Sequence, residues 1–160
     1  MILACQESLS KVSVENSAKF SNNARDYCHS IFEITTQISK MIQSKKNATI
    51  VVADRFPFLY FATEFGLQYR AAFSGCSSAV EAKTSTIAYL IDFVKQNQIP
   101  AVFSIEMSNQ KLAKTVAESC NVPVLELHSF QNVTKADFDS GVTYCTIMLR
   151  NLRALDQGLR

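Results

Sequence analysis

The sequence predicts an α/β protein, a three-layer lobe with a four-stranded parallel sheet, preceded by a long connecting helix. Two observations predict this arrangement. Four short apolar runs are separated by helical segments, and strands that alternate with helices form right-handed crossovers and a parallel sheet covered on both faces. A long segment without glycine or proline precedes the first run and has the spacing of an amphipathic helix.

The long helix is predicted over residues 13–44. Ser13 offers capping chemistry at its start, and Lys45 and Lys46 place positive charge at its negative end. Apolar side chains recur along it at three- and four-residue steps: Phe20, Ala24, Tyr27, Ile31, Ile34, Ile38 and Ile42. This periodicity indicates one apolar face along the whole helix.

The first strand is expected at residues 49–53, where a continuous Ile-Val-Val run indicates burial on both faces of a parallel sheet. Pro57 suits the first turn of a short helix that Gly66 would end. The remaining strands are expected at 67–73, 101–105 and 122–127, and the helices at 58–65, 80–96, 110–119 and from about Asp137 onward.

Composition excludes several classes of protein. The 160 residues suffice for one domain with a sizeable core. Sixteen basic and fourteen acidic side chains give a formal charge of +2, without the basic cluster of a nucleic-acid binder. No apolar run reaches the roughly 18 residues of a membrane span, and the first residues lack the features of a signal peptide. Five dispersed cysteines argue against a disulfide framework.

Polar side chains follow three of the predicted strands. Asp54 and Arg55 come after the first, Glu106 after the third and His128 after the fourth. Parallel strands end at one edge of the sheet, where α/β proteins bind ligands. Asp54, Glu106 and His128 together would give an oxygen and nitrogen ligand set suited to zinc or manganese. The alternative is an ion-pair network, with Arg55 paired to Glu106 or Asp54, that only satisfies polar groups.

A second hypothesis concerns Cys76, which stands in a loop ahead of a predicted helix. A helix N-terminus can activate a thiolate, and His128 would have to serve as its base because His29 lies on the long helix. The sequence contains neither a Gly-x-Ser-x-Gly motif nor a phosphate-binding glycine loop, so nucleotide binding has little support.

Several segments in order resemble the zinc/manganese substrate-binding proteins of metal ABC transporters, the cluster A-I solute-binding proteins. The likeness covers nearly the whole chain and is closest to the Gram-positive branch that carries a DRFPF segment. It rests on Asp54–Tyr60, Ala71–Ser77, Ile105–Glu106, His128–Thr134 and Thr143–Tyr144, with Met148 and Asn151–Leu152.

The resemblance implies a division of the chain. Family members have two α/β lobes joined by a long helix, with the metal ion in the cleft between the lobes. By this likeness, residues 1–47 hold the interlobe helix and residues 48–160 the C-terminal lobe. The N-terminal lobe and its lipoprotein signal are then missing, as expected for a truncated product, a fragment prepared for crystallisation or a natural half-protein. The full-length protein would be extracellular, anchored to the membrane and partnered with an ABC permease.

Only some of the family's metal-ligand positions carry a suitable residue in this sequence. The second histidine falls at Arg55, which cannot coordinate a cation. Glu106 matches the third ligand, and the fourth falls near His128. Asp54 is a possible replacement, although neighbouring residues of a strand point to opposite faces. A pairing of Arg55 with Glu106 is the more economical hypothesis.

The function expected from the resemblance is therefore not enzymatic. The chain would supply half of the interlobe metal site of a zinc or manganese carrier. The alternative is a stand-alone α/β interaction module without metal binding, which could form a homodimer through its exposed lobe face and long helix. A thiol enzyme that uses Cys76 is the third hypothesis.

Overall fold

A computed structural model of the protein describes residues 1–73 and 83–160. These residues form two compact units, residues 1–37 and residues 38–160. One helix, α2 (Ser17–Gln43), begins in the first unit and ends in the second. None of the described helices is long and apolar enough to cross a membrane.

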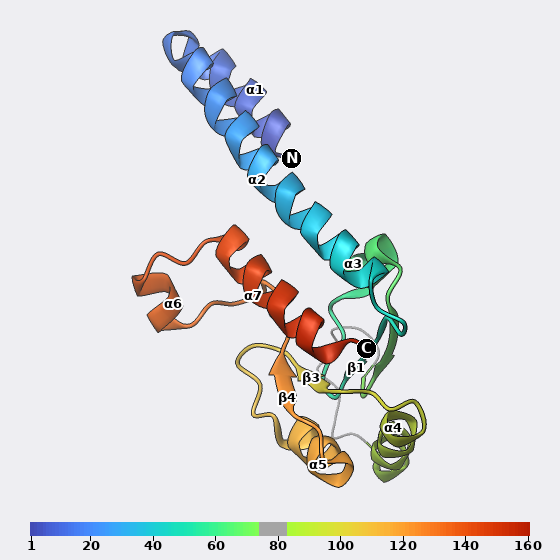
Figure 1. The fold of residues 1–160 in the computed structure, drawn as a ribbon. Coiled ribbons are helices and arrows are strands. Elements are labelled where there is room, and N and C mark those ends of the chain that lie inside the picture. The colour runs from blue at the N-terminus through green and yellow to red at the C-terminus, as the bar shows by residue number, and fades with distance from the viewer. Residues whose placement is uncertain (74–82) are drawn as a thin grey trace. The chain divides into compact units, whose positions relative to one another are not determined.

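The first unit is a helical hairpin. Helix α1 (Ile2–Val12) is followed by the 3₁₀ turn η1 (Val14–Asn16) and by the first part of α2, which runs back alongside α1 (Figure 1). The predicted start of the long helix is close: Ser13 has extended backbone, with φ −138°, and precedes η1, and the α-helix itself begins at Ser17. The expected capping groups are used inside the turn, where the Asn16 side-chain amide donates to Ser13 Oγ at 2.9 Å.

The second unit contains the predicted four-stranded parallel sheet. Its strands are β1 (Thr49–Val52), β2 (Gln68–Ala71), β3 (Val102–Ser104) and β4 (Val124–Glu126), in the order β2-β1-β3-β4. All three pairings are parallel. Between β1 and β2 lies the short helix α3 (Leu59–Phe65), which ends as predicted at Gly66, with φ 67°.

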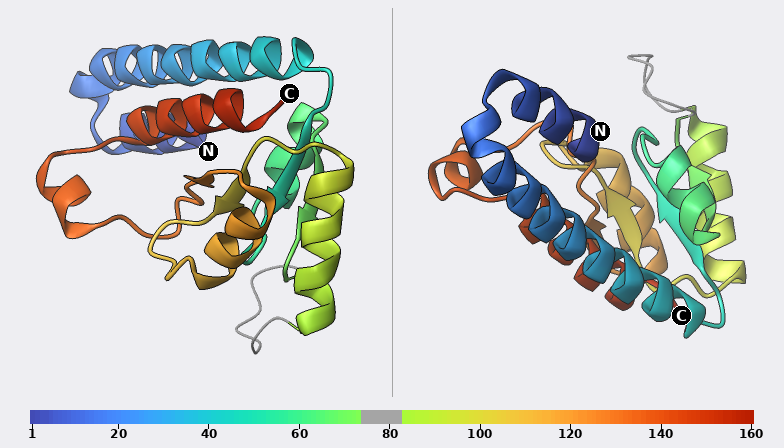
Figure 2. Two further views of the ribbon diagram at one scale, coloured as in Figure 1. Left: turned by 60° about the horizontal axis from the view of Figure 1, so that its bottom comes forward. Right: turned by 90° about the horizontal axis from the view of Figure 1, so that it is seen from above.

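Helices cover both faces of this sheet, so the three-layer architecture is confirmed. Helices α4 (Thr84–Gln96) and α5 (Lys111–Cys120) lie side by side on one face (Figure 1). The apolar core beneath them is formed by Val51, Ala53, Leu90, Val94, Ile99, Val102, Ala113, Val116 and Ala117. Helix α7 (Tyr144–Gly158) lies on the opposite face, and Figure 2 shows it from two further directions.

Close packing of α7 on the sheet depends on a glycine. A Cβ atom added to Gly158 would lie 2.3 Å from Cζ of Phe103, a distance at which something must shift. Phe103 lies on β3 and is fully buried. The missing side chain at Gly158 therefore lets the end of α7 approach the centre of the sheet.

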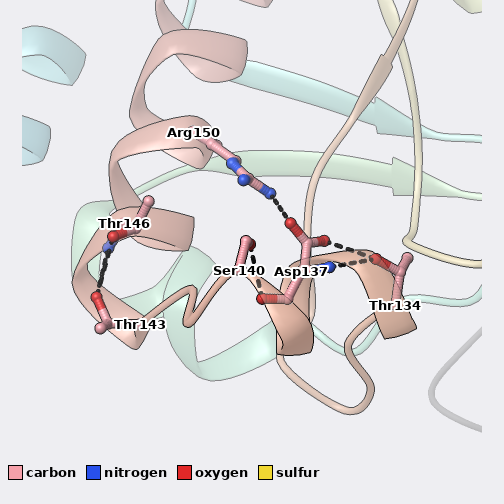
Figure 3. A network of polar contacts seen from close by, with 6 residues as sticks. All are labelled: Thr134, Asp137, Ser140, Thr143, Thr146 and Arg150. Carbon is pink, nitrogen blue, oxygen red and sulfur yellow. Dashed lines mark hydrogen bonds and ion pairs between the residues drawn. The ribbon is translucent and has the colours of Figure 1, made fainter.

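The last helix is shorter than predicted. The expected helix from Asp137 is split into α6 (Lys135–Asp139) and α7. Gly141, with φ 69°, lies between them in a conformation that ends a helix. Each helix also has its own cap, because Thr134 accepts from Asp137 N and Thr143 accepts from Thr146 N (Figure 3).

Four cysteines, Cys5, Cys28, Cys120 and Cys145, are free thiols in the described part of the chain. Burial raises the pKa of Cys120. Cys76 lies outside the described residues, and with it the loop on which the thiol hypothesis depends.

Candidate metal half-site at the carboxyl edge of the sheet

The strand order places two candidate residues beside the switch point of the sheet. After β1 the chain turns outward to β2, whereas after β3 it turns the other way to β4. The order therefore reverses between β1 and β3, where open α/β sheets bind ligands beyond the carboxyl ends of their strands. Asp54 follows β1 and Glu106 follows β3, so these two side chains border the switch point.

Glu106 is a buried carboxylate held by one neighbouring residue. Its side chain is 6% exposed. Oε2 accepts the Ser129 backbone N–H at 2.7 Å, and Oε1 accepts the Ser129 hydroxyl at 2.5 Å. Burial raises the pKa of Glu106, but the Ser129 hydrogen bonds, its own backbone N–H and nearby His128 outweigh burial and lower the pKa below its usual value. Glu106 is therefore ionised at neutral pH.

His128 is fixed by its backbone and by one ring nitrogen. The side-chain amide of Asn151 on α7 accepts from His128 N at 2.8 Å and donates to His128 O at 2.9 Å. The ring Nδ1 accepts the Phe130 backbone N–H at 3.0 Å. In the neutral imidazole only one nitrogen accepts, so this bond assigns the proton to Nε2.

Asp54 is part of a separate contact pair. One oxygen accepts the Arg55 backbone N–H at 2.8 Å, and the other accepts the hydroxyl of Ser108, which follows β3. Ser108 Oγ also accepts from Gln110 N at 3.2 Å, near the start of α5. Asp54 thus joins the loops after β1 and β3, which is a structural role that the sequence did not reveal.

The predicted pairing of Arg55 with Glu106 is wrong. Within residues 1–73 and 83–160, none of the ion pairs involves Arg55, whose side chain is exposed. Glu106 is instead satisfied by Ser129. Among the described residues, the guanidinium of Arg55 is therefore not the partner of the Glu106 carboxylate.

The three predicted ligands do not form one complete metal site. In the part of the chain that the structure describes, no three His, Cys, Asp or Glu side chains are grouped as ligands of a single ion. Glu106 is nevertheless held next to the end of the fourth strand, because Ser129, the residue after His128, donates to both of its oxygens. The edge thus presents a pair, with Asp54 bound separately to Ser108.

Strained backbone follows both members of this pair. Met107, directly after Glu106, has φ 54°, and Phe130, two residues after His128, has φ 66°. Residues other than glycine rarely adopt a positive φ, and backbone strain of this kind is concentrated at functional sites. The Phe130 ring packs against Tyr144, with ring centroids 4.7 Å apart, and this contact holds the loop in place.

Helices α6 and α7 are joined by a polar network that the sequence did not reveal (Figure 3). Arg150 on α7 donates to Asp137 Oδ1 at 2.8 Å, and the Thr134 hydroxyl donates to the other carboxylate oxygen at 3.0 Å. The bonds from Arg150 and Thr134, with a smaller contribution from His128, lower the pKa of Asp137. The spacing from Thr134 to Asp137 resembles a capping box and could have revealed this helix start.

The lowered pKa of Glu106 predicts a pH-dependent contribution to folding. Because the folded pKa lies below the unfolded value of about 4.3, ionised Glu106 stabilises the fold above that value and the contribution is lost as pH falls through the folded pKa. Glu106→Gln should therefore be less stable than the parent at pH 7 and approach it in acid. Urea unfolding across this pH range measures the difference, with exposed Glu118→Gln as control. A stability difference that does not change with pH would contradict it.

The architecture and its edge define a class: a ligand-binding α/β lobe with an acidic and an imidazole group beside its switch point. The family described as zinc-uptake complex component A, periplasmic (ZnuA), matches residues 1–158. The chain therefore belongs to this family, whose members are metal-binding components of ABC transport and not enzymes.

Individual relatives agree with this assignment. The chain is 28% identical over 152 residues to the zinc-binding lipoprotein AdcA of Streptococcus pneumoniae, which covers 95% of this chain and 30% of AdcA. The Zn(II)-bound ZnuA-like domain of the same protein superposes with a TM-score of 0.76 at 27% identity, covering 96% of this chain and 57% of that domain. The chain thus spans less than two thirds of these relatives.

Two more distant structures share the fold. The metal-dependent lipoprotein YcdH of Bacillus subtilis has a TM-score of 0.82 at 21% identity, covering 97% of this chain and 58% of YcdH. A Mn-bound periplasmic metal-binding protein of Candidatus Liberibacter asiaticus has a TM-score of 0.75 at 21% identity, covering 99% and 58%. Zinc and manganese are thus both found among proteins with this architecture.

Proposed function

We propose that the chain is the C-terminal lobe, with its interlobe helix, of a solute-binding protein that captures zinc or manganese for an ABC permease. In this proposal residues 1–47 contain the helix and residues 48–160 form the lobe. The metal ion is the cargo, and the lobe supplies half of its binding site through Glu106 and His128, with Asp54 beside them. The buried carboxylate of Glu106, held by Ser129 in the loop that begins at His128, is the observation that carries the proposal.

Glu106 is well prepared to bind a cation. A carboxylate offers about four lone pairs, and Ser129 uses one on each oxygen, so that each oxygen retains another. Outer hydrogen bonds of this kind orient a metal ligand before the ion arrives. Because Arg55 does not neutralise it, Glu106 also keeps its full charge for the cargo.

The other two candidate ligands, His128 and Asp54, are less ready than Glu106 to bind a metal ion. For His128 Nε2 to bind a metal ion, the ring proton must move to Nδ1, which breaks the hydrogen bond from Phe130 N–H. Both oxygens of Asp54 already accept hydrogen bonds, from Arg55 N and from Ser108. A lone lobe therefore binds its cargo weakly, and the remaining ligands come from a second lobe in the full-length protein.

Calorimetric titration of chelator-treated protein with Zn²⁺ or Mn²⁺ tests the proposal. Glu106→Ala should weaken binding by about 10- to 100-fold, the scale on which perturbed metal sites lose affinity. His128→Ala should have a smaller effect, and the control Glu118→Ala, an exposed carboxylate on α5, should have none. Tight one-to-one binding that survives replacement of both Glu106 and His128 would refute the proposal.

The expected location follows from the same proposal. The full-length protein would be anchored outside the cell membrane as a lipoprotein, as the name of the AdcA relative indicates for that protein. Its permease partner would receive the metal ion from the cleft between the two lobes.

A further inference from the structure

The outer edge of the sheet carries a cavity that is not part of the candidate metal half-site. Its volume is about 500 Å³, within the range of pockets that hold small molecules. The end of α3 and strand β2 line it. Arg70 is the one charged side chain among the described residues of this lining. A ligand in the cavity would therefore meet a single positive charge.

Two carbonyl groups of residues that line the cavity already accept hydrogen bonds. The Ala62 carbonyl accepts the Leu67 N–H at 2.8 Å, at the end of α3. The Tyr69 carbonyl accepts a hydrogen bond from Nη1 of Arg70 at 2.8 Å. A ligand that donates hydrogen bonds would compete with the chain's own donors at both carbonyls.

A backbone donor beside the cavity, in contrast, is free. Strand β2 is the outermost strand of the sheet. Gln68 N donates to the Ala48 carbonyl at 2.9 Å, on the side of β1. Because successive residues of a strand direct their N–H groups to opposite sides, the N–H of Tyr69 points to the open edge. Within residues 1–73 and 83–160 no group accepts it, so this N–H can donate to a ligand.

The guanidinium of Arg70 is held in place and still has donors to offer. Its Nε donates to the Tyr89 hydroxyl at 2.9 Å, and its Cζ lies 4.7 Å from the centre of the Phe93 ring. In the part of the chain that the structure describes, Nη2 has no hydrogen-bond or ion-pair partner. A guanidinium that is fixed before binding loses less conformational entropy when a ligand arrives.

We propose that this cavity binds the carboxylate of a small polar molecule, with the Arg70 guanidinium and the Tyr69 N–H as donors. An ionised carboxylate only accepts hydrogen bonds, and its planar shape matches the paired N–H groups of a guanidinium. One positive charge balances a monoanion, whereas a phosphate dianion would keep an unpaired charge. The side-chain amide of Gln68, which also lines the cavity, can bond the rest of the molecule. This site goes beyond the proposed function and does not depend on the metal cargo.

Nuclear magnetic resonance titration of the metal-free full chain with sodium lactate tests the site. Lactate is a monoanion with one carboxylate and one hydroxyl. The signals of the Tyr69 backbone amide and of the Arg70 Nε–H should shift in a saturable manner. The expected Kd is about 1 mM, which a ligand of about six non-hydrogen atoms can reach. Sodium chloride at the same ionic strength should leave both signals in place.

Substitution of Arg70 should remove this binding. Arg70→Gln should weaken it by at least about tenfold, because a hydrogen bond to a charged group contributes that factor or more. Arg70→Lys keeps the charge but loses the planar fork, so it should restore little of the affinity. It also supplies the same test should Arg70→Gln fail to fold. Arg153→Gln, at an exposed arginine on α7, is the matched control and should bind lactate like the parent.

The outcomes decide both the site and its ligand class. Saturable shifts that are lost in Arg70→Gln and retained in Arg153→Gln support the proposal. Shifts that persist in Arg70→Gln, or that sodium chloride reproduces, would overturn it. Equal or tighter binding of inorganic phosphate in a parallel titration would overturn the choice of a monoanionic carboxylate. None of these results depends on metal binding, so the proposed function is tested separately.

Discussion

Asn151→Leu is expected to lower the free energy of unfolding by about 3 kcal/mol, because two buried backbone groups of His128 lose their partners at about 1–3 kcal/mol each. Asn151 is 3% exposed, and its amide bonds His128 N at 2.8 Å and His128 O at 2.9 Å. Leucine has a similar size, so the loss would reflect the hydrogen bonds. Urea unfolding monitored by circular dichroism measures it.

The control for this prediction lies on the same helix. Gln157 on α7 is exposed, and Gln157→Leu makes the same kind of change away from His128. Its stability should stay within about 0.5 kcal/mol of the parent, as for ordinary surface substitutions. If Asn151→Leu lowered the free energy of unfolding no more than this, the hydrogen bonds of Asn151 would not be what holds the end of β4 against α7.

Phe103→Ala is expected to cost about 4 kcal/mol, within the range for removal of a buried aromatic side chain. Phe103 is fully buried at the centre of the sheet, and its ring occupies the space left by Gly158 on α7. Alanine would leave a cavity between β3 and α7 that this tight contact cannot readily close. The free energy of unfolding in urea gives the cost directly.

A matched aromatic provides the comparison for Phe103. Phe138 on α6 is 75% exposed, so Phe138→Ala removes the same atoms without opening a cavity. We expect a change of no more than about 0.5 kcal/mol at Phe138. Similar costs at the two positions would show that α7 is not anchored through Phe103.

The parallel sheet could be predicted because its two central strands, β1 and β3, are buried on both faces and the strands are bounded by proline, glycine and polar turns. Ile50, Val51 and Val52 are all fully buried, as a run without alternation indicates. The helix boundaries were harder to predict. The predicted last helix ran across Gly141, whereas a positive φ at Gly141 divides it, and residues 14–16 form a 3₁₀ turn ahead of the long helix.

The position of the candidate site could be predicted from the sequence, but the hydrogen-bond partners of its residues could not. Parallel strands bring Asp54, Glu106 and His128 to one edge by topology alone. Which partner each side chain takes depends on loop conformation, and so Ser129, Ser108 and Asn151 were missed. The pairing of Arg55 with Glu106 assumed that opposite charges at one edge meet, but the carboxylate instead accepts one hydrogen bond on each oxygen from Ser129.

The strand β2 at the sheet's edge has a consequence for behaviour at high concentration. Gln68 and Ala72 donate their N–H groups toward β1, which leaves Tyr69 to face the open side. The guanidinium of Arg70 covers that side: it donates to the Tyr69 carbonyl at 2.8 Å and lies 4.7 Å from the centre of the Phe93 ring. A four-residue strand with its outer carbonyl occupied offers a second chain little to pair with, and this protects the lobe from edge-to-edge aggregation.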